Sequence, residues 1–348
     1  MKSKHWKRNM MKFFQGASMG TVVGVIPSAI LGTVTAPYVG ETGLLGFFAR
    51  VVVAFQFAVP FLVGYFTALE FQLSAIETAV LVGSSFIGSG ILKFSGGSWI
   101  LQGTGDLLNT MLTVAVSVCA IKLYNNRYKD LNIVLLPLLG GILPGGIGRL
   151  CLPKVSALTG FLGQGVKQLT TVQPLIMAIV IAVAFALIIM TPLSTVAIAY
   201  AISLTDLAAG AAGLGIVASL FTLFYASCRV NTKGISFSLL FAGPKLFMAN
   251  YLDHLIMTLP IVLNASVVGI FAYLFHIQGS TQSAGFGIVG LSGPMTSYSF
   301  MEGPFLVKLG ILSGVYVGIP LGIAALTHTL LTRVGLYSDN IFRYAKIK

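Results

Sequence analysis

Charged residues are scarce in this chain of 348 amino acids, where Asp, Glu, Lys and Arg together make up 9%. Soluble domains carry about 25% of these residues and use them to cover their surface. Hydrophobic residues make up 56% of the chain. Several apolar runs reach the roughly 20 residues that a helix needs to cross a bilayer. The composition therefore predicts an all-α, polytopic membrane protein.

The sequence also lacks the motifs of common nucleotide-dependent and metal-dependent enzymes. It has no Walker A motif, no HExxH and no GxGxxG that opens a soluble βαβ unit. Its three cysteines show no CxxC spacing, and its four histidines are scattered. We therefore expect no cofactor, no metal site and no enzymatic activity.

Positive charge is concentrated at the ends of apolar segments. The net charge is +12, and basic residues cluster in MKSKHWKRNMMK at the start, in KLYNNRYK at 122–129 and in the C-terminal tail. Lys and Arg accumulate on the cytoplasmic side of membrane proteins. This pattern predicts cytoplasmic termini and a cytoplasmic 122–129 loop, and it gives no reason to expect nucleic acid as a partner.

The apolar segments predict about ten transmembrane segments. The predicted regions are a basic cytoplasmic N-terminus (1–12), a first membrane repeat (13–168), a second membrane repeat (173–334) and a cytoplasmic tail (335–348). Gly and Pro interrupt the stretches 137–155 and 285–304, which predicts re-entrant hairpins, because broken backbone at membrane depth needs protein or water around it. Gly16, Gly20 and Gly24 form a face of small residues, which we expect to pack within the molecule.

Short similarities recur in the same order in the two halves and predict an internal twofold repeat. The matched positions are Pro27 with Pro192, Glu41 with Asp206, Asp106 with Asp253, and Pro144 with Pro294. The halves are parallel if 131–165 is a re-entrant hairpin and inverted if this segment crosses once. Interrupted segments at corresponding positions point to the binding site of a transporter.

Carboxylates within or beside apolar segments are the main candidates for solute binding. A charge at the bilayer centre costs roughly 2.5–3.5 kcal/mol on insertion scales, so its presence suggests a function. Asp206, Asp106 and Asp253 could also cap the helices that follow them. The candidate substrate-binding residues are Asp206, Glu302, Glu41, Asp106, Asp253, Asn231 and Ser194.

The roles of two basic residues, Lys245 and Arg149, also need to be explained. Lys245 follows Gly243 and Pro244, and it could mark a cytoplasmic end of its segment. Arg149 could pair with an anionic group or extend along the helix to the lipid surface, and we favour the second explanation.

Two interrupted stretches carry a family resemblance. LLPLLGGILPGGIGRLCLPKVSALTGFLG (135–163) and NTKGISFSLLFAGPK (231–245) resemble the PfoR-like proteins. These are similar to the membrane-embedded IIC subunit of bacterial sugar phosphotransferase systems, and some are described as toxin regulators. The resemblance covers nearly the whole chain. It implies a homodimer in the bacterial cytoplasmic membrane, with an elevator-like transport domain that holds re-entrant hairpins.

The resemblance also bears on the binding site. In sugar IIC subunits, a hairpin glutamate in a Gly-Ile-Thr-Glu motif contacts the sugar. That motif is absent here, and its nearest counterparts are SFMEGP at Glu302 and SLTD at Asp206. No IIA or IIB domain is fused to the sequence, so a separate IIB-like partner would supply phosphate, or the solute would move unphosphorylated.

We therefore predict an integral membrane transporter of a small polar solute, such as a sugar or a related metabolite, that works by alternating access. The alternative is a membrane-embedded sensor or regulator that binds a solute or a partner without transport. The expected partners are the solute, membrane lipids, a second copy of the chain and a separate IIB-like protein.

Overall fold

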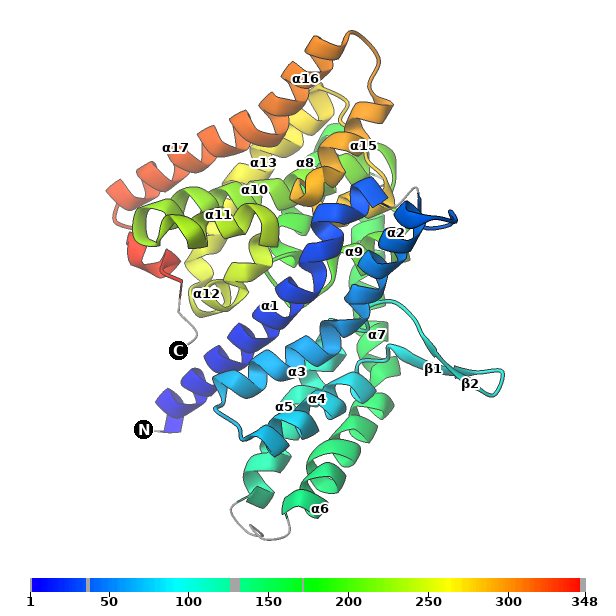
Figure 1. The fold of residues 1–348 in the computed structure, drawn as a ribbon. Coiled ribbons are helices and arrows are strands. Elements are labelled where there is room, and N and C mark those ends of the chain that lie inside the picture. The colour runs from blue at the N-terminus through cyan, green and yellow to red at the C-terminus, as the bar shows by residue number, and fades with distance from the viewer. Residues whose placement is uncertain (1, 36–37, 126–131, 171, 345–348) are drawn as a thin grey trace. The chain divides into compact units, whose positions relative to one another are not determined.

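The computed structural model describes residues 2–35, 38–125, 132–170 and 172–344. Within these ranges the chain is almost entirely helical, and its two strands form one antiparallel hairpin (Figure 1). The chain divides into two compact units. Unit 1 consists chiefly of Met1–Ser28 and Thr35–Leu158, and unit 2 consists of Ala29–Val34 and Thr159–Ala345. The loop residues 126–130, together with Lys346 and Lys348, on which the topology prediction partly rests, lie outside the described residues.

Unit 1 contains most of α1 and the elements up to the first part of α7. These elements are α1 (Lys2–Thr35), α2 (Leu44–Phe55), η2 (Gln56–Ala58), α3 (Val59–Glu70), α4 (Ala75–Gly88), β1 (Leu92–Ser95), β2 (Ser98–Leu101), α5 (Leu107–Asn125), α6 (Asn132–Leu136), the π-helical turn η4 (Pro137–Ile142) and α7 (Leu143–Leu169).

Unit 2 contains the elements that follow α7, and many of them are short. They are α8 (Pro174–Ile188), α9 (Thr195–Ala201), α10 (Asp206–Val230), α11 (Lys233–Ala242), η5 (Pro244–Phe247), α12 (Met248–Asp253), η6 (Leu255–Met257), α13 (Thr258–Leu274), α14 (Thr281–Phe286), η7 (Val289–Leu291), α15 (Ser292–Phe300), α16 (Phe305–Ser313), the π-helical turn η8 (Gly314–Gly318), α17 (Ile319–Arg333) and η9 (Asp339–Phe342).

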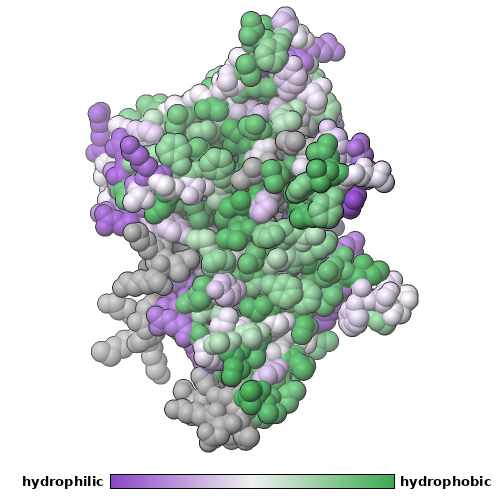
Figure 2. Space-filling view, in the orientation of Figure 1, coloured by the Kyte–Doolittle hydropathy of each residue, from purple (hydrophilic) through white to green (hydrophobic). Residues whose placement is uncertain are grey.

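Six helical segments among the described residues are long and apolar enough to cross a membrane. They are Leu44–Glu70, Leu107–Tyr124, Ile133–Leu169, Asp206–Val230, Leu255–Leu274 and Phe305–Arg333. Shorter apolar helices lie at Ala75–Gly88, Pro174–Ile188 and Lys233–Ala242. Hydrophobic residues cover most of the face shown in Figure 2. The all-α, polytopic membrane architecture is confirmed, whereas the total of about ten spans stays a prediction.

The small-residue face of α1 packs within unit 1, as the sequence predicts. A Cβ atom added at Gly16 or Gly20 would collide with the backbone of Thr67 or Val63 on α3. A Cβ atom added at Gly24 would collide with the side chain of Val59, which also belongs to α3. These glycines therefore serve close contact between two helices of the same unit.

The helix α10 occupies the centre of unit 2. It packs against α8, α13 and α17, and every residue from Ala208 to Leu223 is buried. At Gly215, an added Cβ atom would collide with the Ala182 carbonyl of α8. Small residues thus bring the two helix backbones into direct contact.

The stretch 137–155 does not form the predicted re-entrant hairpin. The elements α6, η4 and α7 follow one another without a break in the candidate span Ile133–Leu169. Proline removes a helical N–H donor and crowds the preceding turn, and Pro144 stands two residues after the π-helical turn η4. The wider turn accommodates the proline within a continuous helix. Of the two arrangements considered for this segment, a single crossing agrees with this helix.

Serine hydroxyls join neighbouring helices in the same way in both units. In unit 1 the hydroxyl of Ser85 on α4 donates to the Pro60 carbonyl of α3 at 2.6 Å. In unit 2 the hydroxyl of Ser219 on α10 donates to the Ala186 carbonyl of α8 at 2.8 Å. Each bond links a buried serine to the preceding long helix of its unit.

Two fully buried asparagines extend this correspondence. The Nδ2 atom of Asn109 on α5 donates to the carbonyls of Gly88 on α4 and Gly148 on α7. The Nδ2 atom of Asn264 on α13 donates to a carbonyl of α10 at 3.2 Å and to the Pro320 carbonyl of α17 at 2.9 Å. In each unit one amide therefore connects three helices, including the one that contains a π-helical turn.

The prolines paired by the sequence matches lie in different settings, and the internal repeat stays a prediction. Pro27 lies inside α1, whereas Pro192 lies in the turn between α8 and α9. Pro294 lies in α15. The position that resembles Pro144 is Pro320, because each stands two residues after a π-helical turn. The shared features lie on α3, α4, α5 and α7 in unit 1 and on α8, α10, α13 and α17 in unit 2.

Candidate substrate site

Two interrupted helical segments meet in unit 2. The first runs from α8 through the short α9 to α10, and the second runs from α13 through the short α14 to α15. Helix α14 packs against both α9 and α10. Interrupted backbone in a membrane protein must find its hydrogen bonds in protein or in water. The groups that form hydrogen bonds with the backbone at these breaks therefore define the candidate site.

Backbone contacts hold the two segments together. The Thr195 hydroxyl at the start of α9 donates to the Gly285 carbonyl of α14 at 2.9 Å. The Gly279 N–H donates to the Asp206 carbonyl at 3.0 Å, forming an isolated antiparallel bridge. Beside this bridge, Gly210 lies so close to the chain at 277–279 that any Cβ atom there would collide with it. The start of α10 is thereby fixed against the segment before α14.

Asp206 is an exposed carboxylate at this junction. Its backbone has φ 55°, in the left-handed region, which costs roughly 1–2 kcal/mol but is tolerated best by Asn and Asp among residues with a side chain. The Thr205 hydroxyl donates to Asp206 Oδ2 at 2.8 Å. Thr205 is the N-cap residue of α10, so the alternative that Asp206 caps this helix is wrong. Its charge in the first turn is nevertheless favoured by the helix dipole.

The side chain of Lys245 donates hydrogen bonds to the turn between α8 and α9. Its Nζ atom donates to the carbonyls of Thr191 and Leu193 at 2.7 and 2.8 Å. Both carbonyls belong to the turn after α8, which ends at Ile188, and buried backbone carbonyls need a hydrogen-bond donor. Lys245 lies outside the six candidate spans, and burial lowers its pKa to about 7. The charged and the neutral amine can both donate these two bonds.

We expect Lys245→Met to lower the free energy of unfolding by about 2 kcal/mol, because the Thr191 and Leu193 carbonyls would lose their donor. Thermal unfolding of the purified protein in detergent measures this effect. The matched control is Lys233→Met on α11, where the lysine is exposed. Equal unfolding temperatures for the two variants would show that the contact does not stabilise the break.

A protein-family model matches nearly the whole chain. The family model described as Phosphotransferase system, EIIC covers residues 11–344. The chain belongs to this EIIC family. Comparisons with curated proteins and with solved structures gave no match. The predicted likeness to IIC subunits is confirmed, and the EIIC protein is a multi-pass cell-membrane protein of a sugar transport system. The closer likeness to PfoR-like proteins stays a prediction.

The other carboxylates predicted in unit 2 of the EIIC protein lie in different settings. Glu302 is exposed in the turn between α15 and α16. Asp253 is the last residue of α12, with its Oδ2 atom 3.7 Å from His254 Nδ1. Its predicted role as a cap for a helix that begins at His254 is therefore wrong. Ser194 is half-buried directly before α9, in the same interrupted segment as Asp206.

Two predicted residues belong to unit 1. Glu41 is exposed in the turn between α1 and α2, where its backbone carbonyl accepts from Arg50. Asp106 caps α5, since its Oδ1 atom accepts from the Asn109 N–H at 3.0 Å. Its Oδ2 atom accepts from the Ser156 hydroxyl at 3.2 Å. The capping alternative for Asp106 is confirmed. The described ranges of the EIIC protein contain no group of three or more His, Cys, Asp or Glu side chains placed to hold a metal ion.

Asn231 binds the C-terminal segment of the chain. Its Nδ2 atom donates to the Ser227 hydroxyl and to the Phe342 carbonyl, and its Oδ1 atom accepts from the Tyr344 N–H at 2.8 Å. Asn250 donates to two further carbonyls of the same segment. The amide of Asn231 is thus used by the protein itself, a role that its sequence surroundings did not indicate.

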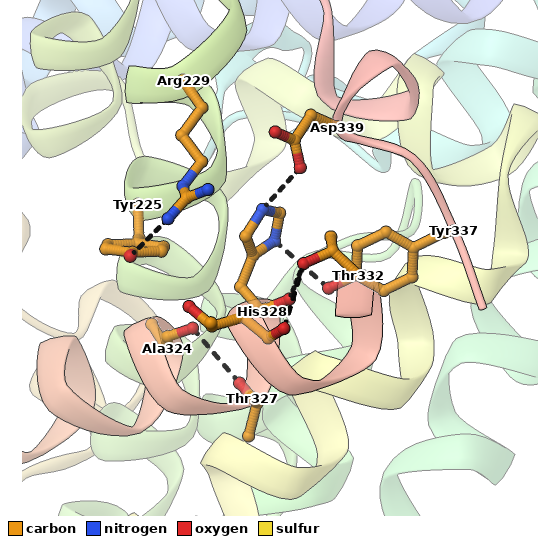
Figure 3. A network of polar contacts seen from close by, with 9 residues as sticks. Tyr225, Arg229, Ala324, Thr327, His328, Thr332, Tyr337 and Asp339 are labelled. Atoms are coloured by element: carbon orange, nitrogen blue, oxygen red, sulfur yellow. Dashed lines mark hydrogen bonds and ion pairs between the residues drawn. The ribbon is translucent and has the colours of Figure 1, made fainter. Parts of the chain in front are cut away.

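A buried histidine on α17 also holds the C-terminal segment in place (Figure 3). His328 on α17 is fully buried, with Nε2 at 2.9 Å from Asp339 Oδ1 and Nδ1 at 3.2 Å from the Tyr337 hydroxyl. Burial, and then the charge of Asp339, raise the pKa of Tyr337 to about 12. The phenol keeps its proton and can donate to Nδ1, which places the imidazole N–H toward Asp339. The segment 337–344 is therefore a structured part of unit 2.

Proposed function

We propose that this EIIC protein transports a small polar solute, such as a sugar, and that Asp206 binds it. The observation that carries this proposal is the position of Asp206, an exposed carboxylate at the junction of two interrupted segments. Carboxylates accept charge-assisted hydrogen bonds from hydroxyl groups, about twice as strong as neutral ones. Interrupted helices in transporters commonly surround the solute. Ser194, in the same segment, is the second residue that we assign to this site.

Glu302 is the other carboxylate that we retain for solute binding. It lies in unit 2 in a turn with Gly303 and Pro304, and its side chain is exposed. The side chains of Asp106, Asp253 and Asn231 have partners within the protein. Glu41 lies in unit 1, away from the interrupted segments of unit 2 along the chain, and its backbone carbonyl accepts from Arg50. We therefore place the binding function on Asp206 and Ser194, with Glu302 as the competing position.

The recurring hydrogen bonds support an internal repeat as the framework of transport. Ser85 and Ser219, Asn109 and Asn264, and the two π-helical turns recur in the same order along the chain. We propose that a duplicated four-helix arrangement underlies both units. Alternating access would then proceed by an elevator-type movement in a homodimer with cytoplasmic termini. Separate partner proteins would supply any phosphate, and this chain would not catalyse the phosphoryl transfer by itself.

Uptake into proteoliposomes tests the proposal. The purified protein is reconstituted, and entry of radiolabelled hexoses, pentoses and hexitols is measured, with binding of the same compounds followed by thermal shift in detergent. Saturable uptake of one compound that also raises the unfolding temperature is the expected result. Binding without uptake, with or without a phosphorylating partner, would favour the sensor alternative and contradict transport.

A further inference from the structure

The connection between α4 and α5 is a short β-hairpin with two different faces. Its register pairs Leu92 with Leu101 and Phe94 with Trp99, while Lys93 pairs with Ile100. Because side chains alternate along a strand, the first two pairs share one face and the lysine lies on the other. The rings of Phe94 and Trp99 are 5.0 Å apart. One face of the hairpin is therefore wholly apolar and aromatic.

This apolar face is open. Phe94 is 62% exposed and Trp99 is 66% exposed, the two largest side chains of the hairpin. Figure 1 shows the hairpin extending away from α4 and α5. Trp and Phe side chains bury large areas when they find a partner. A pair of them exposed on one small face indicates that something outside the chain covers it.

The base of the hairpin is fixed directly at the ends of two apolar helices. The Gln102 N–H donates to the Ile91 carbonyl at 2.9 Å, and the Asp106 N–H donates to the Ser89 carbonyl at 2.8 Å. Helix α4 is apolar, and α5 forms the candidate span that begins at Leu107. The hairpin thus connects the end of an apolar helix with the start of a candidate membrane span.

The helices on either side of the hairpin in the chain also expose apolar side chains. Ile87 near the end of α4 and Leu112 near the start of α5 are 37% and 40% exposed. The two helices that carry the hairpin therefore expose apolar side chains as well. No acidic residue occurs between Glu77 and Asp106, so Lys93 is a net positive charge in this segment.

We propose that the β1–β2 hairpin lies in the interface of a phospholipid bilayer. Its face of Leu92, Phe94, Trp99 and Leu101 rests on the upper acyl chains, and Lys93 reaches the phosphate groups. Trp is enriched at this depth because its ring is apolar while its N–H needs a polar partner. A long basic side chain can extend to the headgroups from the same position. The hairpin holds unit 1 at a fixed depth in the membrane.

The native tryptophans make this proposal testable. The sequence contains Trp6 and Trp99 and no other tryptophan, so Trp6→Phe leaves Trp99 as the single reporter. The variant is reconstituted into phosphatidylcholine–phosphatidylglycerol vesicles with or without lipids brominated near the headgroup end of the acyl chains. We expect blue-shifted emission that the brominated lipids quench strongly and that acrylamide in the buffer quenches weakly.

Two other outcomes would overturn the proposal. Strong quenching by acrylamide without quenching by brominated lipids would place the hairpin in water. Resistance to both quenchers would mean that protein covers the aromatic face, for example a second copy of the chain. The Trp99→Phe variant, which retains Trp6, identifies the part of the signal in the unmodified protein that comes from Trp99. Unchanged circular dichroism and thermal unfolding of both variants ensure that the emission reports the folded state.

Discussion

A single methyl group at position 215 should destabilise this protein more than any substitution at its surface. In Gly215→Ala the new Cβ atom would occupy the space of the Ala182 carbonyl on α8. Both groups belong to helix backbones at the centre of unit 2, so neither can turn aside like a flexible side chain. Overpacking of this kind costs about 1–3 kcal/mol and occasionally more. We expect a loss of about 3 kcal/mol, measured as a lower unfolding temperature in detergent by fluorescence-detected size-exclusion chromatography.

The control for Gly215 is a second helical glycine with free space around it. An added Cβ atom at Gly322 on α17 would meet no atom within 4 Å. Alanine is favoured over glycine in a helix by about 1 kcal/mol, so Gly322→Ala should leave the unfolding temperature unchanged or raise it slightly. If Gly215→Ala behaves like Gly322→Ala, the close approach of α8 and α10 is refuted.

Asp206→Asn should abolish solute uptake while the protein remains folded. The amide keeps the size of the carboxylate, can still accept from the Thr205 hydroxyl and tolerates the left-handed backbone at this position. It loses the charge that strengthens hydrogen bonds to solute hydroxyl groups. A loss of about 3 kcal/mol, the upper value for a hydrogen bond to a charged group, corresponds to roughly a hundredfold weaker affinity. Uptake into proteoliposomes and thermal shift with the transported compound measure the change.

Two further carboxylates serve as comparisons for Asp206. Glu41→Gln removes the same charge from an exposed side chain in unit 1 and should leave uptake unchanged. Glu302→Gln tests the competing position in unit 2. If Glu302→Gln abolishes uptake and Asp206→Asn does not, the site lies at the turn before α16 and the assignment of Asp206 is wrong. In every case, the unfolding temperature without solute must match that of the unmodified protein.

The sequence predicted the membrane class of the fold but not the course of its interrupted segments. Composition alone shows whether a chain has enough polar residues to cover a surface exposed to water. This chain has too few of them. Gly and Pro show where a helix is disturbed, but they do not show whether the helix continues or ends at that point. At Pro144 a π-helical turn keeps the helix continuous, whereas near Pro192 the helix stops and a new one begins. The two outcomes look alike in sequence because they depend on neighbouring helices.

The candidate site could be predicted only in part, for a related reason. Asp206 stands out in sequence because charge is rare in an apolar run. Lys245 does not stand out, since its partners Thr191 and Leu193 lie more than fifty residues earlier in the chain. Asn231 looked like a solute ligand because polar residues surround it, but its partners at 342 and 344 are more than a hundred residues away. Contacts at such separations follow from tertiary packing, which one sequence without a fold does not reveal.

The close packing of α10 limits how unit 2 can move. This helix is enclosed by α8, α13 and α17, and its backbone touches that of α8 at Gly215. Sliding α10 past its neighbours would break this contact and the bonds of Ser219 and Asn264. If unit 2 moves in transport as we propose, we expect these helices to shift together as one rigid body. Asp206 would travel with that body, and a solute bound to it would change its surroundings without changing its ligands.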